Sequence, residues 1–272
     1  MLEAIRAPLF VPADRPERFA KAAASGADAI ILDLEDAVAE GAKDVARAAL
    51  RRDFTDLPLI VRINTTGSTA FEADLAAVTD LRPDAIMLPK ADEARQIGML
   101  VDVLPCPVIA LIESARGLAK AREIAATKGV VRLAFGSVDF CADLCCSHTR
   151  EVLAPARFEL VLASRLAGIA APLDGVTVQL DDVSTTSEDA AYAKETGMNG
   201  KMCIHPKQIE PVLRAFAPSQ SEIDWARRVL ASGDGAVQVD GAMVDEPVRL
   251  RARAILTQAD HSAFGMADRD IP

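Results

Sequence analysis

The sequence contains few aromatic residues. Phe, Trp and Tyr make up only 4% of its 272 residues, whereas half of the chain is hydrophobic. The high hydrophobic content excludes an intrinsically disordered protein. The core must therefore be built from Ala, Leu, Ile and Val, which is typical of helices packed on a parallel sheet. A chain of this length is sufficient for one large core, such as that of an α/β barrel.

Basic residues are in the minority. The chain has 30 Lys and Arg against 40 Asp and Glu, which gives a formal net charge of -10. This balance excludes nucleic acid as the expected partner, because binding to phosphates needs a basic surface. It is compatible with a small anionic ligand, since a few local Arg and Lys residues can bind one.

Long apolar runs are absent. No run approaches the roughly 20 residues that a membrane helix needs. The initial segment MLEAIRAPLF lacks the apolar region and cleavage site of a signal peptide. We therefore expect a soluble, cytoplasmic protein with no membrane partner.

The cysteines form no recognisable framework. There are five, and an odd count in a chain of this size does not indicate a set of disulfides. Cys141, Cys145 and Cys146 lie close together in the sequence, but they lack the second Cys or His pair that is typical of a zinc site. We expect them to be unpaired thiols.

Short apolar runs alternate with amphipathic, helix-like stretches along most of the chain. The eight runs are 8–12, 29–35, 59–64, 85–90, 108–113, 131–136, 175–179 and 200–205. Most follow one another at about 23 to 30 residues, the length of one strand, one helix and two loops. No GxGxxG motif follows the first run, which disfavours a dinucleotide-binding fold. The pattern predicts an α/β fold, a (β/α)8 or TIM barrel, over residues 1–217.

Residues 218–272 exceed a minimal barrel. They contain helix-like stretches and two short apolar runs around Asp240 and Gly241, a pair that favours a β-hairpin turn. We expect a C-terminal helical and hairpin extension. It would act as a lid or an oligomer contact and would not be an independent domain.

Polar residues follow nearly every predicted strand. They are Asp14 and Arg15, then Asp33, Glu35 and Asp36, then Arg62 and Asn64, Lys90, Glu113, Asp139, Gln179 and His205. The carboxyl ends of barrel strands meet at one face, which hosts catalysis. We therefore expect a polar cluster rich in carboxylates at that face.

Clustered carboxylates repel one another unless a cation neutralises them. Mg²⁺ usually binds one or two protein carboxylates together with substrate oxygens. Glu113 and Asp139 follow adjacent strands and are the predicted ligands; a 2-oxo acid would complete the shell, and the metal would polarise its carbonyl. Arg62 offers a forked donor to an enolate or carboxylate. This set predicts a metal-dependent lyase that breaks a carbon–carbon bond through an enolate.

Structural interpretations of these residues stay open. Glu113 and Asp139 could instead pair with Lys90 or a helix N-terminus, and Arg62 could form an ion pair with Glu35 or Asp36. We expect Asp33, Glu35 and Asp36 to support the ligands rather than bind the metal directly. Asp36 could also cap the segment that follows it.

Lys90 and His205 have two interpretations each. A strand-end lysine can form a Schiff base when its pKa is lowered, but neighbouring carboxylates should raise the pKa of Lys90. We therefore expect it to support the acidic cluster as an ammonium ion. His205 precedes Pro206 at the start of a helix, where it could act as a base, bind an anion through its backbone or cap the helix.

Seven motifs occur in order along the chain: FVPADRPERFAKA, ILDLEDAV, VRINTTGS, IMLPKAD, LIESARGL, LAFGSVDFCADL and KMCIHPKQI. Together they resemble those of the citrate lyase β-subunit-like proteins of the HpcH/HpaI aldolase superfamily, and the resemblance extends over about residues 8–257. The resemblance implies a TIM barrel, usually a homotrimer, with Mg²⁺ or Mn²⁺ at its mouth. It also implies metal ligation by Glu113 and Asp139 and contact of Arg62 with the substrate and the enolate oxygen.

The resemblance further implies a coenzyme A site. Arg15 and Lys21 match positions that meet the phosphates of coenzyme A, and Ile204 and His205 match a segment that lines the substrate or coenzyme A site. The segment DGAMVDEP (240–247) resembles the lid of the malyl-CoA and citramalyl-CoA lyase branch. Asp245 matches the aspartate that reaches a neighbouring subunit there and transfers a proton. A polar hairpin residue at a trimer contact is the structural alternative.

One departure bears on the pocket. Many family members read GTED where this chain reads GSVD, so Val138 replaces a glutamate. The metal ligand at the fourth position is kept, whereas the pocket beside it differs.

The expected activity is Mg²⁺-dependent cleavage of a 3-hydroxyacyl-CoA of the citryl, malyl or citramalyl type to acetyl-CoA and a 2-oxo acid. Two alternatives are a class II aldolase acting on a free 2-oxo-3-deoxy acid and a β subunit that acts only within a citrate lyase complex. Use of a free acid would favour the first alternative, and inactivity without partner subunits would favour the second.

Overall fold

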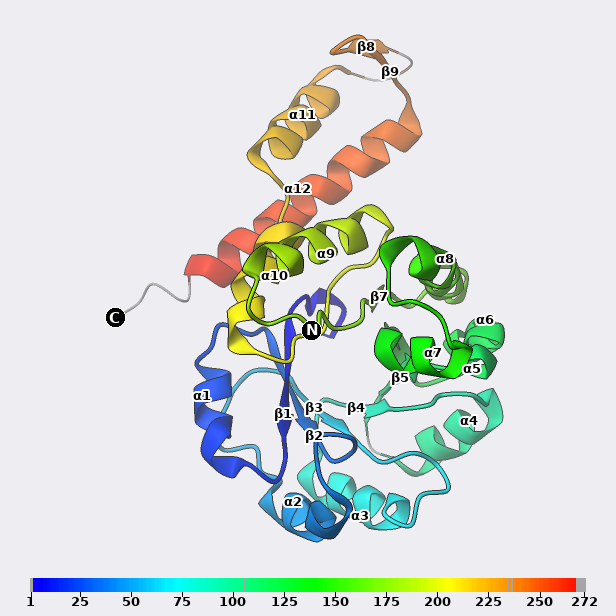
Figure 1. The fold of residues 1–272 in the computed structure, drawn as a ribbon. Coiled ribbons are helices and arrows are strands. Elements are labelled where there is room, and N and C mark those ends of the chain that lie inside the picture. Colours follow the sequence, from blue (N-terminus) through cyan, green and yellow to red (C-terminus); the bar gives the residue numbers. More distant parts are fainter. Residues whose placement is uncertain (1, 105, 234, 236, 268–272) are drawn as a thin grey trace. The chain divides into compact units, whose positions relative to one another are not determined.

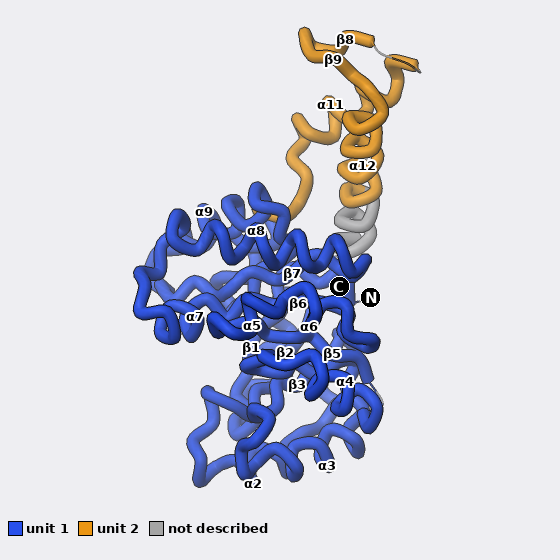
Figure 2. Tube along the Cα trace, turned by 90° about the vertical axis from the view of Figure 1, so that its right-hand side faces the viewer, with its two compact units in different colours: residues 1–214 blue, residues 215–272 orange. Residues whose placement is uncertain are grey.

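The computed structural model describes residues 2–104, 106–233, 235 and 237–267, with side chains described up to residue 259. The chain forms two compact units (Figures 1 and 2), residues 1–214 and residues 215–272. The first unit contains the predicted barrel and the second contains the predicted extension.

The first unit contains a seven-stranded parallel sheet in which every strand pairs with the next one in the sequence. The strands are β1 (Pro8–Pro12), β2 (Ala29–Asp33), β3 (Leu59–Arg62), β4 (Ala85–Leu88), β5 (Val108–Ile112), β6 (Val130–Phe135) and β7 (Ala170–Leu173). Nearly all residues of β2, β4 and β5 are buried, as is usual for parallel strands that are covered on both faces.

Residues 200–203 join the two edges of this sheet. The N–H of Met202 donates to the carbonyl of Asp174 beyond β7 at 3.1 Å, and the N–H of Cys203 donates to the carbonyl of Pro8 in β1 at 2.9 Å. Both contacts are parallel bridges. The predicted TIM-barrel fold is thus confirmed, with the eighth strand present as a short bridging segment.

The predicted seventh strand at residues 175–179 is wrong, because the strand lies earlier, at Ala170–Leu173. The preceding helix ends at Gly168 with a φ of 68°, and the chain then enters the sheet directly. Asp174 directly follows the strand, and its Oδ2 forms a buried ion pair with Nζ of Lys201 at 3.0 Å. Val178 is 58% exposed, so the Val-Thr-Val sequence that suggested a strand lies in a loop.

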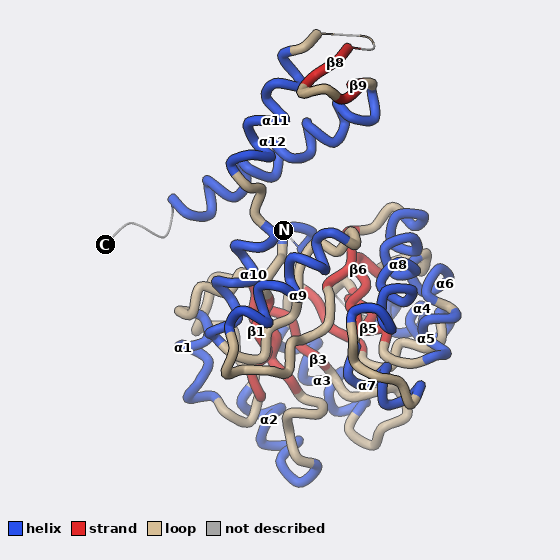
Figure 3. Tube along the Cα trace, turned by 45° about the horizontal axis from the view of Figure 1, so that its top comes forward, coloured by secondary structure: helices blue, strands red, loops and turns tan. Residues whose placement is uncertain are grey.

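Helices surround the sheet and connect its strands (Figure 3). They are η1 (Leu2–Ala4), η2 (Pro16–Arg18), α1 (Phe19–Ala23), η3 (Glu40–Ala42), α2 (Lys43–Ala49), α3 (Phe71–Leu81), α4 (Ala94–Val103), α5 (Ala115–Ala119), α6 (Ala121–Ala125), α7 (Ser137–Leu144), α8 (Arg150–Ala167), α9 (Val183–Glu195), η4 (Pro206–Gln208) and α10 (Ile209–Phe216). The core inside the sheet is largely aliphatic and includes Ile31, Ile60 and Ile109.

Arg132 closes the amino-terminal end of the barrel. Its side chain is fully buried and donates to the backbone carbonyls of Leu2, Ile5, Ala171 and Asn199 at 2.7–3.0 Å. One guanidinium thereby satisfies acceptors from three separate segments, which would otherwise be buried without partners. Arg132 therefore stabilises this end of the barrel. A functional site is expected at the opposite end, where the carboxyl ends of the strands meet.

The second unit contains α11 (Gln220–Ala231), β8 (Val237–Val239), β9 (Ala242–Val244) and α12 (Glu246–Ala267). The predicted hairpin is confirmed: β8 and β9 are antiparallel, and its turn residues Asp240 and Gly241 have φ values of 51° and 83°, as a type I′ turn requires. Its action as a lid or an oligomer contact stays a prediction. Within the described residues, no helix is both long and apolar enough to cross a membrane.

Candidate active site

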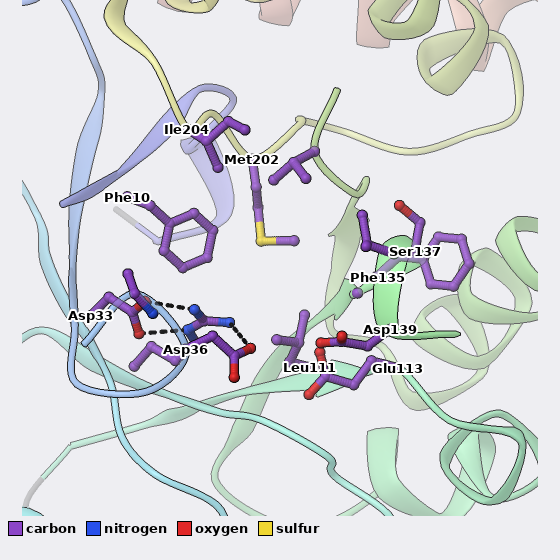
Figure 4. A pocket seen from close by; sticks show the side chains of 15 residues that line it. Phe10, Asp33, Asp36, Leu111, Glu113, Phe135, Ser137, Asp139, Met202 and Ile204 are labelled. Carbon is purple, nitrogen blue, oxygen red and sulfur yellow. Dashed lines mark hydrogen bonds and ion pairs between the residues drawn. The ribbon is translucent and has the colours of Figure 1, made fainter. Parts of the chain in front are cut away.

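The carboxyl ends of the strands surround a cavity of about 230 Å³. Figure 4 shows its acidic and apolar side chains. The lining residues are Phe10, Asp33, Asp36, Ala37, Arg62, Leu111, Glu113, Phe135, Gly136, Ser137, Val138, Asp139, Val176, Met202 and Ile204. The structure therefore brings together the predicted metal ligands, Arg62, Asp33, Asp36 and Ile204 in one place.

Asp33, the last residue of β2, is fully buried and organises the turn that follows. Its two carboxylate oxygens accept hydrogen bonds from the backbone N–H groups of Glu35 at 2.9 Å and Ala37 at 3.0 Å. The same oxygens accept from Nε and Nη2 of Arg62 at 2.7 and 2.6 Å. This bidentate pair fixes the guanidinium plane at the mouth of the barrel.

Arg62 also contacts other residues around the cavity. Its Nη1 lies 3.0 Å from Oε2 of Glu35, and the guanidinium lies over the ring of Phe10, 4.9 Å from its centroid. Burial alone would lower the pKa of Arg62, but the hydrogen bonds and charge of Asp33 raise it above its ordinary value. The ion pair with Glu35 that was weighed as an alternative is present, and the contact of Arg62 with substrate stays a prediction.

Glu35 is a buried carboxylate with two neighbouring cations. Neither of its oxygens accepts a hydrogen bond among the described residues, but Nη1 of Arg62 lies 3.0 Å from Oε2 and Nζ of Lys90 lies 3.6 Å from Oε1. Burial is the main reason that the pKa of Glu35 is raised to about 7, and the charge of Arg62 opposes it. A further cation close to this carboxylate would therefore stabilise its charged form.

Glu113 follows β5 and is 3% exposed. Its Oε1 accepts the backbone N–H of Lys90 at 2.8 Å. Burial, and then the charge of Glu35, raises the pKa of Glu113 to about 8. Gly136 makes the position possible, because a Cβ there would lie 2.4 Å from Oε2 of Glu113.

Asp139 lies in the first turn of α7, one strand further along the barrel. Its carboxylate points toward that of Glu113 (Figure 4). Two adjacent carboxylates, one of them buried with a raised pKa, are a suitable donor set for a hard divalent cation, which would remove their mutual repulsion. The residues present therefore fit a Mg²⁺ or Mn²⁺ ion.

Lys90 occupies a strained position beside the acidic cluster, with a φ of 47°. Partial burial lowers the pKa of its ammonium group, but the carboxylates of Glu35 and Glu113 outweigh burial and raise it. The predicted direction of this shift is confirmed. A protonated lysine is a poor nucleophile, so the geometry disfavours a Schiff base.

Six predicted residues lie outside the cavity lining: Glu35 and Lys90, described above, and Arg15, Lys21, His205 and Asp245. Arg15 precedes η2 and lies 4.0 Å from Glu17, and both Arg15 and Lys21 are exposed. His205 caps η4, since its Nδ1 accepts the N–H of Lys207 at 3.1 Å. Asp245 lies in the second unit, where its Oδ1 accepts the N–H of Val248 at the start of α12 at 3.3 Å. Their roles toward a substrate stay predictions.

Lys43 is a positioning residue that the sequence analysis missed. It is buried in α2, and its Nζ donates to the carbonyls of Leu34 and Glu35 at 2.7 Å each. Asn64 donates to the carbonyl of Leu34 at 2.9 Å and to Asp74 at 2.7 Å. These bonds hold the turn that carries Glu35. A lysine in an amphipathic stretch gives no sequence signal for such a contact.

Ser137 and His148 form a second pair that was missed. Ser137 lines the cavity, and its Oγ lies 2.9 Å from Nε2 of His148. This bond attaches the loop between α7 and α8 to the start of the helix that carries Asp139. The cysteines of the same region are free thiols, as predicted, and the described residues contain no group of three or more His, Cys, Asp or Glu arranged to hold a metal.

Fold and site together define a TIM-barrel protein with a paired-carboxylate centre at the barrel mouth. The chain matches the HpcH/HpaI aldolase/citrate lyase family over residues 6–206, and C–C bond lyases of the TIM-barrel fold over residues 166–266. The protein therefore belongs to the HpcH/HpaI aldolase/citrate lyase family and is a carbon–carbon lyase by that membership.

Relatives cover nearly the whole chain. A citrate lyase subunit beta-like protein of Mycobacterium tuberculosis is 43% identical over 92% of this chain and 94% of its own length. The citrate lyase subunit beta of Escherichia coli is 34% identical over 95% and 94%. A (3S)-malyl-CoA thioesterase of Cereibacter sphaeroides is 32% identical over 96% of both chains.

Solved structures of the M. tuberculosis protein CitE share the fold. A complex with magnesium, acetoacetate and coenzyme A has a TM-score of 0.86 at 42% identity and covers 95% of this chain and 99% of its own. A complex with magnesium and pyruvate has a TM-score of 0.78 at 39% identity and covers 94% and 100%. A complex of the citrate lyase beta subunit from the same organism with oxaloacetate and magnesium has a TM-score of 0.72 at 42% identity and covers 80% and 99%.

Proposed function

We propose that the protein is a Mg²⁺-dependent lyase that cleaves a 3-hydroxyacyl-CoA of the citryl, malyl or citramalyl type to acetyl-CoA and a 2-oxo acid through an enolate. The observation that carries the proposal is the buried Glu113 carboxylate, with a pKa raised to about 8 and with Asp139 beside it. Relatives that act on or bind coenzyme A compounds support the choice of substrate class.

Glu113 and Asp139 would hold the cation. When bound, Mg²⁺ (or Mn²⁺) would supply Lewis-acid polarisation of the oxo-acid oxygens and orient them. The backbone N–H of Lys90 fixes the Glu113 carboxylate. Asp33, Glu35 and Lys90 surround these ligands and set the local charge.

Arg62 would stabilise the enolate of the thioester. A guanidinium has five N–H donors, so it can bind Asp33 and Glu35 and still donate to a ligand oxygen in the cavity that it lines. A base accepts the hydroxyl proton and the new oxo-acid carbonyl forms. The electron pair of the broken carbon–carbon bond moves onto the thioester, so negative charge develops on its oxygen. Donors fixed in advance at that position lower the barrier.

Asp245 would return a proton to the enolate carbon, in a neighbouring copy of the chain. Arg15 and Lys21 are exposed cations that suit the phosphates of coenzyme A, with Ile204 and His205 beside the thioester arm. The family resemblance supports these assignments, together with a cytoplasmic homotrimer.

The direct test is to incubate the purified protein with malyl-, citramalyl- and citryl-CoA in the presence of Mg²⁺ and to measure the free oxo acid. Release from at least one thioester is expected, with loss in EDTA and in Glu113→Ala. Asp53→Asn is the control, because the Asp53 side chain is 80% exposed and does not line the cavity. It should retain most of the activity.

Two outcomes would point elsewhere. Cleavage of free 2-oxo-3-deoxy acids, with every thioester left intact, would identify a class II aldolase. Activity that appears only on addition of other citrate lyase subunits would identify a β subunit that works within a complex. Release that resists EDTA would contradict the metal-dependent mechanism.

A further inference from the structure

The cavity lining combines carboxylates with apolar side chains. The carboxylates are those of Asp33, Asp36, Glu113 and Asp139 (Figure 4). The apolar part of the lining includes Phe10, Leu111, Phe135, Val138, Val176, Met202 and Ile204. A ligand that binds the cation through one carboxylate must place its remaining atoms within this mixed surface.

Carboxylates of the protein already compensate the positive charge that lines the cavity. Arg62 is the sole Lys or Arg among the described residues that line the cavity. Its charge is compensated by Asp33, at 2.6 and 2.7 Å, and by Glu35, at 3.0 Å. Even with a divalent cation bound, the four lining carboxylates exceed the combined charge of the cation and Arg62 by one.

A second carboxylate on the ligand would therefore be disfavoured. It would be repelled by the lining carboxylates and would lose water against the apolar side chains. Its nearest cations, Arg62 and Lys90, already share their charge with Asp33 and Glu35. Binding of an uncharged alkyl group is favoured instead, because removal of its apolar surface from water is favourable. Val138 and Ile204, which are 44% and 40% exposed, present apolar surface to whatever enters the mouth.

We propose, on the basis of the proposed function, that this site selects thioesters whose 2-oxo acid half carries a short alkyl side chain, methyl or ethyl. It discriminates against a carboxymethyl side chain, which is that of oxaloacetate. Val138 is the specificity-determining residue, since it lines the cavity and directly precedes Asp139, the proposed metal ligand.

Binding without turnover is the first test. Calorimetric titration of the Mg²⁺-loaded protein with pyruvate, 2-oxobutyrate and oxaloacetate should give dissociation constants at least tenfold lower for the two alkyl acids. Equal or tighter binding of oxaloacetate would overturn the inference. In turnover, kcat/KM for citramalyl-CoA should exceed that for citryl-CoA by at least tenfold. Selective binding of the alkyl acids without cleavage of any thioester would refute the proposed lyase and leave the selectivity standing.

Val138→Lys tests the residue. The side chain is exposed enough for the variant to fold. The new cation should lower the ratio of the dissociation constant for oxaloacetate to that for pyruvate at least fivefold. This effect on the ratio should be smaller at high salt, because screening weakens exposed charges. Val45→Lys is the matched control, since Val45 is 62% exposed on α2 and does not line the cavity. An unchanged preference in Val138→Lys would remove Val138 from the selecting surface.

Discussion

The backbone N–H of Lys90 donates a hydrogen bond of 2.8 Å to Oε1 of Glu113, and Lys90 adopts a left-handed φ of 47° at this point. A non-glycine residue pays on the order of 1–2 kcal/mol for that conformation. The chain thus accepts local strain where it orients a carboxylate. One N–H is not enough to offset burial, so Glu113 retains a high affinity for a proton or a metal.

The metal-free protein should lose stability as the pH rises from about 4.5 to about 8. The pKa of Glu113 rises from 4.5 to about 8 on folding, so between these values the folded state keeps a proton that the unfolded state releases. Glu35, with a pKa of about 7, acts in the same direction. Thermal unfolding in EDTA over this pH range checks the slope, and added Mg²⁺ should restore stability most strongly at pH 8.

Glu113→Gln isolates the contribution of that carboxylate. The variant should unfold at a higher temperature than the wild type at pH 8 in EDTA, because it buries no charge, and it should lose the stabilisation by Mg²⁺. Asp53→Asn should change neither quantity appreciably, because its side chain is 80% exposed and lies outside the cavity lining. Wild-type stability that stays constant or increases over this range would contradict the buried, raised-pKa carboxyl.

Lys90 should not form a Schiff base. The carboxylates of Glu35 and Glu113 raise its pKa, so the amine stays protonated at neutral pH. Treatment with pyruvate and sodium borohydride should leave the intact mass and the activity unchanged. Lys90→Gly, which suits the left-handed φ and keeps the backbone N–H to Glu113, is the companion variant. A reduced adduct on the wild type that is missing from Lys90→Gly would refute this prediction.

The periodicity of the sequence was sufficient to predict the barrel, because each run from β1 to β6 combines dense aliphatic residues with a polar residue at its end. The same logic brought Glu113 and Asp139 together from strands that are adjacent in the sheet. It failed at β7, where Ala170, Ala171 and Pro172 have little strand propensity. The strand is defined instead by its place beside β6.

Long-range polar contacts left no sequence signal. Lys43 lies in an amphipathic stretch and would be read as solvent-exposed, yet it is 7% exposed and bonded to two carbonyls of the β2 turn. The pairing of His148 with Ser137 depends on the path of a loop. Both contacts join residues that only the folded chain brings together, whereas a polar residue at the end of a strand can be recognised from the local sequence.

Arg132 and the carboxylate cluster lie at opposite ends of the barrel. Substitution of Arg132 should therefore lower the stability of the protein without changing its affinity for Mg²⁺. Arg132→Met leaves buried carbonyls unpaired and should lower the free energy of unfolding by about 3 kcal/mol or more. Arg122→Met is the control, because the Arg122–Glu159 pair is on the surface, where such pairs contribute about 0–1 kcal/mol. Urea unfolding and Mg²⁺ titration check both variants. Weakened Mg²⁺ binding in folded Arg132→Met would show that the two ends are coupled.

Asp245 and Glu113 should complement each other between copies of the chain if the proposed trimer places Asp245 in a neighbour's site. Glu113→Ala and Asp245→Asn should each be inactive alone. In a trimer that contains both variants, a site is complete when its own chain keeps Glu113 and its neighbour keeps Asp245; this holds for one of the three sites, so about a third of the wild-type activity should return. Co-expression with two different tags and purification over both provides the mixed species. Mixed trimers without activity would mean that Asp245 acts within its own chain, whereas activity of Asp245→Asn alone would mean that Asp245 transfers no proton.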